Sequence, residues 1–146
     1  MLYVDYRVSR KVATLRLGIG SVLPMSTTSI GRAYLWGLPE GERQALIDEF
    51  KRRAGPQGDA LEQAIRASFS ELQATGTCAV LGGFQRSTFG VSLPVRLGRD
   101  GKLMSMSCGK ADVDFDLEAE RDRIAPALKQ TAAQLQAYLA DCTSGL

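Results

Sequence analysis

Four small hydroxyl side chains stand in a row at positions 26–29, in the order Ser-Thr-Thr-Ser, just before a helical pattern. Such a run could supply a nucleophile, line a phosphate-binding loop or cap the helix. A nucleophile needs a general base, but the chain has no histidine, and the first glycine of a Gly-x-Ser-x-Gly elbow is missing. A phosphate loop needs Gly-Lys followed by Ser or Thr, which is absent. We therefore predict that Ser26, Thr27 or Thr28 caps the helix, either alone or beside a bound anion or carboxylate.

Other residues with possible chemistry form weaker patterns. Gly18-Ile19-Gly20 lacks the third glycine of a dinucleotide loop, so no nucleotide cofactor is predicted. Aspartates alternate along 112–116 and could hold a cation on one side of an extended chain, but a solvated loop is the favoured interpretation. The cysteines Cys78, Cys108 and Cys142 form no Cys-x-x-Cys pair. We predict free thiols, buried at Cys78 and Cys108, and no metal site.

The composition is that of one globular domain. The chain has 146 residues, 45% of them hydrophobic and 23% charged, with a net charge of +2. This balance gives no basis for broad binding to nucleic acid or to an anionic membrane. No apolar run is long enough to span a bilayer, and the N-terminus lacks the pattern of a signal peptide, so we expect a cytoplasmic protein. The missing histidine and the absence of paired carboxylates in a motif argue against an enzyme.

Hydrophobic periodicity predicts an α+β fold. Expected strands lie at 2–6, 12–17, 77–81, 89–97 and 102–108, and expected helices begin near 29, 39, 59 and 117. Strands and helices that do not alternate singly indicate an antiparallel sheet with helices packed on it. Pro94 predicts a sheet edge or a bulge, and Pro126 predicts a kink or a later start of the last helix. Because the chain opens inside a strand pattern, we expect that part of the natural protein precedes Met1.

Several blocks then resemble the effector-binding domain of IclR-type bacterial transcription regulators. That family shows R-x-G, a gap, LP, a few small residues, G-[KR]-A-x-L and a second LP. The matching residues here are Arg16-Leu17-Gly18, Leu23-Pro24, Gly31-Arg32-Ala33, Leu35 and Leu38-Pro39. Later blocks in family order are Leu72 to Gly76, Gly90 to Val95, and Asp100 to Leu103 with Ser105-Met106-Ser107.

This resemblance implies a GAF-like domain over residues 1–146, with a central antiparallel sheet flanked by helices. It implies that a small metabolite binds between the sheet and the helices and shifts a homodimer or homotetramer between DNA-binding states. DNA would be held only by an N-terminal winged helix-turn-helix domain that this chain lacks, along with the sensor domain's first helix and strand. An alternative is an interaction module of the same fold that binds no ligand.

The resemblance also assigns pocket positions. The family's ligand contacts fall on Val12, Leu15, Ser29, Ile30, Val80, Gly90, Ser107 and Gly109. The apolar members would form walls, and Ser29 and Ser107 would supply polar contacts beside the backbone N–H groups of the helix start. Val80 and Gly90 replace larger or acidic side chains of the family, which suggests a roomier and less polar pocket. We therefore expect a bulkier or partly aromatic organic acid.

Overall fold

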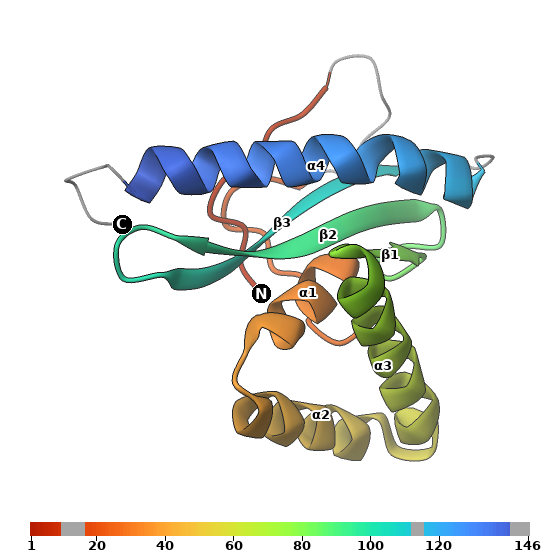
Figure 1. Ribbon diagram of the computed structural model, residues 1–146. Coiled ribbons are helices and arrows are strands. Elements are labelled where there is room, and N and C mark those ends of the chain that lie inside the picture. The colour runs from red at the N-terminus through yellow and green to blue at the C-terminus, as the bar shows by residue number, and fades with distance from the viewer. Residues whose placement is uncertain (10–16, 112–115, 141–146) are drawn as a thin grey trace.

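A three-stranded antiparallel sheet separates one long helix from the other helices (Figure 1). This computed structural model describes residues 1–9, 17–111 and 116–140. The elements in chain order are α1 (Ser29–Gly37), α2 (Glu40–Ala54), a short 3-10 turn η1 (Gly55–Gln57), α3 (Gly58–Thr75), β1 (Cys78–Leu81), β2 (Thr88–Leu97), β3 (Lys102–Ala111) and α4 (Leu117–Ala140). The strand order is β1-β2-β3, so the α+β prediction is confirmed.

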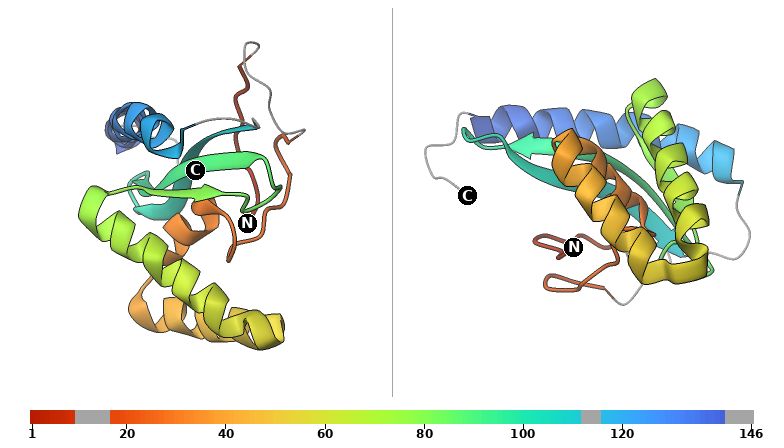
Figure 2. Two further views of the ribbon diagram at one scale, coloured as in Figure 1. Left: turned by 90° about the vertical axis from the view of Figure 1, so that its right-hand side faces the viewer. Right: turned by 90° about the horizontal axis from the view of Figure 1, so that it is seen from below.

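The helices form layers on opposite sides of the sheet. Helix α4 lies along one side, and α1 lies against the other, with α2 and α3 beyond α1 (Figures 1 and 2). Helix α3 ends beside β1, where Gly76 adopts a left-handed φ of 79° and its N–H bonds the Leu72 carbonyl, as the sequence predicted. Helices therefore cover part of the sheet on both sides.

The two faces of the sheet have different residues because β2 alternates with period two. The α4 face carries the apolar series of β2, which packs on Ile124 and Leu128 of α4 and on Met104 and Met106 of β3. The α1 face carries the other series of β2 and the residues of β3 that pair with it. Its members are Gly90, Ser92 and Pro94 of β2, and Ser105, Ser107 and Gly109 of β3.

Pro94 lies in the central strand, which corrects part of the expectation. Its pairing with Ser105 belongs to an unbroken register from Thr88 to Leu97, so the described sheet has no bulge there. However, β1 pairs with β2 only as far as Ser92. Pro94 lies two residues past that point, where no β1 residue needs the N–H that proline lacks. The central strand is thus locally an edge.

The N-terminal strand prediction is wrong within the described residues. Residues 2–6 form no strand, only an isolated bridge between Leu2 and Val22, with a further hydrogen bond from the Tyr3 N–H to the Ser21 carbonyl (3.0 Å). Most of the expected strand at 12–17 lies outside the described residues. Alternation alone therefore did not create a sheet strand here.

Helix α4 begins at Leu117, as expected, with Pro126 inside it, so the alternative of a start delayed by this proline is wrong. Asp116 caps this helix, since its carboxylate accepts from the N–H groups of Glu118 and Ala119. Pro39 is the N-cap of α2 rather than a first-turn residue. The alternating aspartates at 112 and 114 lie outside the described residues.

Candidate functional site

The site begins at the N-terminus of α1, which Thr28 caps. Its hydroxyl accepts from the Gly31 N–H (3.2 Å) and donates to the Pro24 carbonyl (2.6 Å). The first intrahelical bond runs from the Arg32 N–H to the Thr28 carbonyl (3.0 Å). The N–H groups of Ser29 and Ile30 precede that bond and point out of the helix end, where an acceptor with negative charge is favoured. The predicted cap is confirmed, and the threonine nearest the helix provides it.

A buried arginine fixes the position of this helix start. The Arg32 Nε donates to the Ser26 carbonyl (2.9 Å), and its Nη1 donates to the Ala64 carbonyl and the Ser68 hydroxyl of α3 (both 3.1 Å). Burial lowers the pKa of this guanidinium, and the Cys78 thiol opposes that shift weakly. Neutral oxygens rather than a carboxylate satisfy these three bonds. Arg32 therefore ties the 26–29 loop to α3 as a structural residue.

Ser29 connects α1 to the sheet. Its Oγ lies 2.8 Å from the Ser92 Oγ in a buried hydrogen bond, and its carbonyl accepts from the Cys78 thiol at 3.5 Å. Ser92 is opposite Ser107 in the β2–β3 pairing. Three hydroxyls, those of Ser29, Ser92 and Ser107, thus form a row across the α1 face at the level of the helix start.

A hollow of about 960 Å³ opens beside α1 and β3. Six of the predicted ligand positions line it: Ser29, Ile30, Val80, Gly90, Ser107 and Gly109. The other two, Val12 and Leu15, lie outside the described residues. The lining includes both faces of β3, because this strand is at the edge of the sheet. The part on the α1 face, next to the N–H groups of α1, is the candidate site.

The pocket is not roomier at Gly90, contrary to expectation. A Cβ added at this glycine would lie 2.7 Å from the Ser29 Oγ, so the serine hydroxyl already fills the space of the missing side chain. Gly83 in the β1–β2 loop is similarly close to Thr27, since a Cβ added at Gly83 would lie 2.3 Å from the Thr27 carbonyl oxygen. These glycines let the sheet and the helix start approach each other closely.

The N-terminal segment closes part of the site. Tyr3 lines the hollow, and burial raises the pKa of its phenol, while the Ser107 hydroxyl acts on it as a hydrogen-bonding neighbour that lowers the pKa. Backbone bonds join residues 1–3 to the loop at 18–23, including Leu23 N–H to Met1 carbonyl (2.8 Å). An aromatic ring therefore stands beside the predicted polar contact.

Sequence reasoning missed two residues of this arrangement, Ser92 and Tyr3. Ser92 was detectable, since period two places it on the same face as Gly90. Tyr3 was not, because its position depends on how residues 1–9 fold back against β3.

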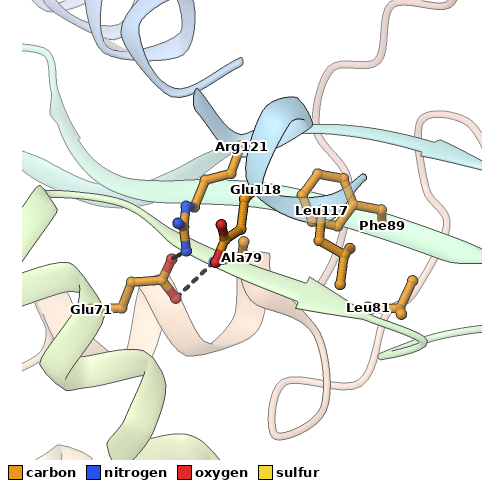
Figure 3. A pocket seen from close by; sticks show the side chains of 7 residues that line it. All are labelled: Glu71, Ala79, Leu81, Phe89, Leu117, Glu118 and Arg121. Atoms are coloured by element: carbon orange, nitrogen blue, oxygen red, sulfur yellow. Dashed lines mark hydrogen bonds and ion pairs between the residues drawn. The ribbon is translucent and has the colours of Figure 1, made fainter. Parts of the chain in front are cut away.

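A second, smaller hollow of about 130 Å³ lies between α3, β1 and α4 (Figure 3). The Glu71 carboxylate accepts from the Arg121 guanidinium (3.5 Å) and from the Ala79 N–H (3.2 Å). The opposite wall is apolar, with Phe89, Leu81 and Leu117. Glu71 here satisfies an outward N–H of edge strand β1 and joins the two helices, which is a structural role.

Two further functions find no support in the described part of the chain. No three histidine, cysteine or carboxylate side chains come together in residues 1–9, 17–111 and 116–140 as a metal site would require. None of the helices in these ranges has the length and apolar character needed to cross a membrane.

Comparison with known proteins relates this architecture to bacterial regulators. A scan against protein-family models finds no match, and a search of curated proteins finds no match. Among solved structures, the chain is similar to an IclR family transcriptional regulator from Brucella abortus, with a TM-score of 0.87 and 24% identity over 95% of this chain and 52% of that one. The IclR of Thermotoga maritima gives a TM-score of 0.76 at 15% identity, over 94% of this chain and 56% of that one.

A ligand complex is also among the similar structures. An IclR homolog from Microbacterium hydrocarbonoxydans, complexed with 4-hydroxybenzoate, gives a TM-score of 0.67 at 17% identity, over 89% of this chain and 52% of that one. The chain thus spans about half the length of these three relatives, which are regulators rather than enzymes. The resemblance to the IclR family is confirmed at the level of the fold: this chain has the architecture that these regulators share over about half of their length.

Proposed function

We propose that this chain is a ligand-sensing domain of a transcription regulator, and that it binds a small organic acid in the hollow on the α1 face. The observation that carries this proposal is that Ser29 and Ser107 line this hollow beside the outward N–H groups of Ser29 and Ile30, with the Ser29 hydroxyl bonded to the buried Ser92. An acid docked there gains hydrogen bonds and the favourable end of the helix dipole. Apolar walls with few polar groups suit a partly aromatic acid.

The binding of 4-hydroxybenzoate by the similar regulator supports an aromatic class of ligand. We further propose that ligand binding modulates DNA binding by an N-terminal domain outside this chain, within a homodimer or homotetramer. The chain itself does no chemistry and binds no DNA sequence specifically. Light scattering would measure the assembly, and a gel shift at physiological salt would measure the DNA binding.

The direct test is the melting temperature with a panel of benzoate, hydroxybenzoates, phenylacetate, pyruvate and glyoxylate. A ligand at about 100 times its dissociation constant adds roughly 2.7 kcal/mol to the unfolding free energy. Ser107→Ala should reduce the rise in melting temperature caused by any acid that stabilises the wild type. Ser70→Ala should leave it unchanged, because Ser70 is exposed on α3 and its hydroxyl bonds its own helix at Arg66. No response to any acid would contradict the proposal.

One observation favours a second candidate function, an interaction module without a ligand. Protein side chains already contact two of the predicted polar groups, since Ser92 bonds Ser29 and Tyr3 lies against Ser107. In that case no acid shifts the melting temperature, while dilution of the full chain changes its oligomeric state. The Tyr3→Ala variant distinguishes the two functions. In a sensor it should expose Ser107 and change the affinity for the acid, whereas in an interaction module it should change only the stability of the fold.

A further inference from the structure

The small hollow of Figure 3 lies where the apolar core between α4 and the sheet is interrupted. A helix that packs on a sheet presents an apolar residue every three or four positions, which here are 117, 121, 124 and 128. Ile124 and Leu128 are buried, but position 121 holds an arginine. The Arg121 guanidinium contacts Glu71 of α3 at 3.5 Å. The first two turns of α4 therefore leave the sheet beneath them uncovered by an apolar side chain at this position.

One side of this hollow is apolar. Leu81 and Phe89 are partners in the β1–β2 pairing, so their side chains lie on the same face of the sheet, and Leu117 borders them from α4. Phe89 is buried, whereas Leu81 and Leu117 are 51% and 39% exposed. The volume of about 130 Å³ is close to that of a cavity that holds benzene in another protein, roughly 150 Å³. The hollow is therefore large enough for one aromatic ring or a short branched chain.

The charged side of the hollow has an excess of negative charge. Two carboxylates, of Glu71 and Glu118, and one guanidinium, of Arg121, line it, and Figure 3 shows the two α4 side chains directed toward Glu71. Glu71 is held in place by Arg121 and by the Ala79 N–H (3.2 Å). Glu118 forms no ion pair with any residue in the described ranges. A cationic group at this rim would therefore find an unpaired carboxylate beside an apolar wall.

From this geometry we propose that the hollow is a second small-molecule site, which binds a primary amine with a short aromatic or branched apolar body. The body lies against Leu81, Phe89 and Leu117, where it fills the gap in the core and its apolar surface leaves water. The ammonium group stays at the solvent-exposed rim and pairs with the Glu118 carboxylate. This site is on the α4 face, so it is independent of the acid-binding hollow on the α1 face.

The test titrates the full chain with benzylamine, benzyl alcohol and benzoate, which share one ring and differ in charge, and follows the backbone amide signals by NMR. Benzylamine should shift the signals of Ala79, Leu81 and residues 117–121 in a saturable way. Benzyl alcohol should bind there about two- to fivefold more weakly, and benzoate should leave these signals unchanged. No saturable shift with benzylamine, or equal affinity for benzyl alcohol, would overturn the inference.

A pair of matched variants tests the role of the carboxylate. Glu118→Gln should weaken benzylamine binding about two- to fivefold, the range of a solvent-exposed ion pair, and leave benzyl alcohol binding unchanged. Glu40→Gln is the control, because Glu40 is also an exposed acid in the first turn of a helix but does not line the hollow. Equal losses of affinity in the two variants, or no loss in Glu118→Gln, would contradict the proposal. Neither result bears on the acid-binding hollow, whose test uses other ligands and Ser107.

Discussion

The two faces of the sheet have opposite chemical character, although the same strands build both. The α4 face is a continuous apolar layer, in which Val91, Leu93 and Val95 are almost completely buried against α4. The α1 face carries serines, glycines and a proline at the intervening positions. Small side chains let α1 approach closely at Ser29 and leave a hollow next to it. The difference suggests that one face supplies stability and the other supplies the binding site.

The largest effect is expected from removing volume from the α4 face. Leu93→Ala should lower the unfolding free energy by about 3 kcal/mol, because the buried leucine is 6% exposed and the cavity left behind adds to the lost transfer energy. Urea denaturation at 25 °C measures this loss. Ligand affinity of the folded protein should change little, because Leu93 is not among the residues that line the hollow.

The matched control is the adjacent residue on the other face. Ser92→Ala should cost about 1 kcal/mol, because it leaves the Ser29 hydroxyl without its partner. Equal losses for Leu93→Ala and Ser92→Ala would contradict a division of roles between the faces.

An effect smaller than that of Leu93→Ala is expected from adding volume to the α1 face. Gly90→Ala should lower the unfolding free energy by about 2 kcal/mol, because its Cβ would lie 2.7 Å from the Ser29 Oγ. The same substitution in a Ser29→Ala background should cost much less, since the clashing atom is gone. Urea denaturation of the four proteins gives the coupling between the two positions.

A coupling near zero would show that the close approach of α1 to Gly90 is not what limits side-chain size there. It would also restore the roomier pocket suggested by the resemblance, since an alanine would then fit without strain.

Local patterns in the sequence predicted the elements whose partners are near in the chain. The stripe of Ile65, Phe69 and Leu72 is buried on α3, as period 3.6 requires. The Asp-Gly turn joins β2 to β3 with Gly98 and Gly101 at positive φ. Each of these features depends on a few neighbouring residues, which is why the sequence was sufficient.

Long-range pairings were not predictable in the same way. Alternation predicted a strand at 2–6, but it could not say whether a strand partner existed. Leu2 and Val4 are 60% and 58% exposed in the structure. Likewise, the 26–29 hydroxyl run indicated a cap, but not that Ser29 would bond Ser92, 63 residues away. Such contacts depend on how α1 packs on the sheet.

The smallest expected effect concerns the thiol behind the site. Cys78 is fully buried on the α1 side of β1, and burial, aided by the Glu71 carboxylate, raises its pKa from 9.0 to about 12. The folded state therefore holds this proton more tightly than the unfolded chain. The resulting stability is fully present below about pH 9 and is lost as the pH rises toward 12. Between pH 8 and pH 9.5 the unfolding free energy should fall by about 0.8 kcal/mol through this group.

Cys78→Ala supplies the comparison, because it lacks the group but keeps every other residue that titrates in this range. Its unfolding free energy, measured by urea denaturation at both pH values, should fall by less than that of the wild type. Identical slopes would mean that water reaches the thiol in the folded state. In that case the start of α1, whose Ser29 carbonyl accepts from this thiol, would be less tightly packed on β1 than the buried hydrogen bond at 3.5 Å implies.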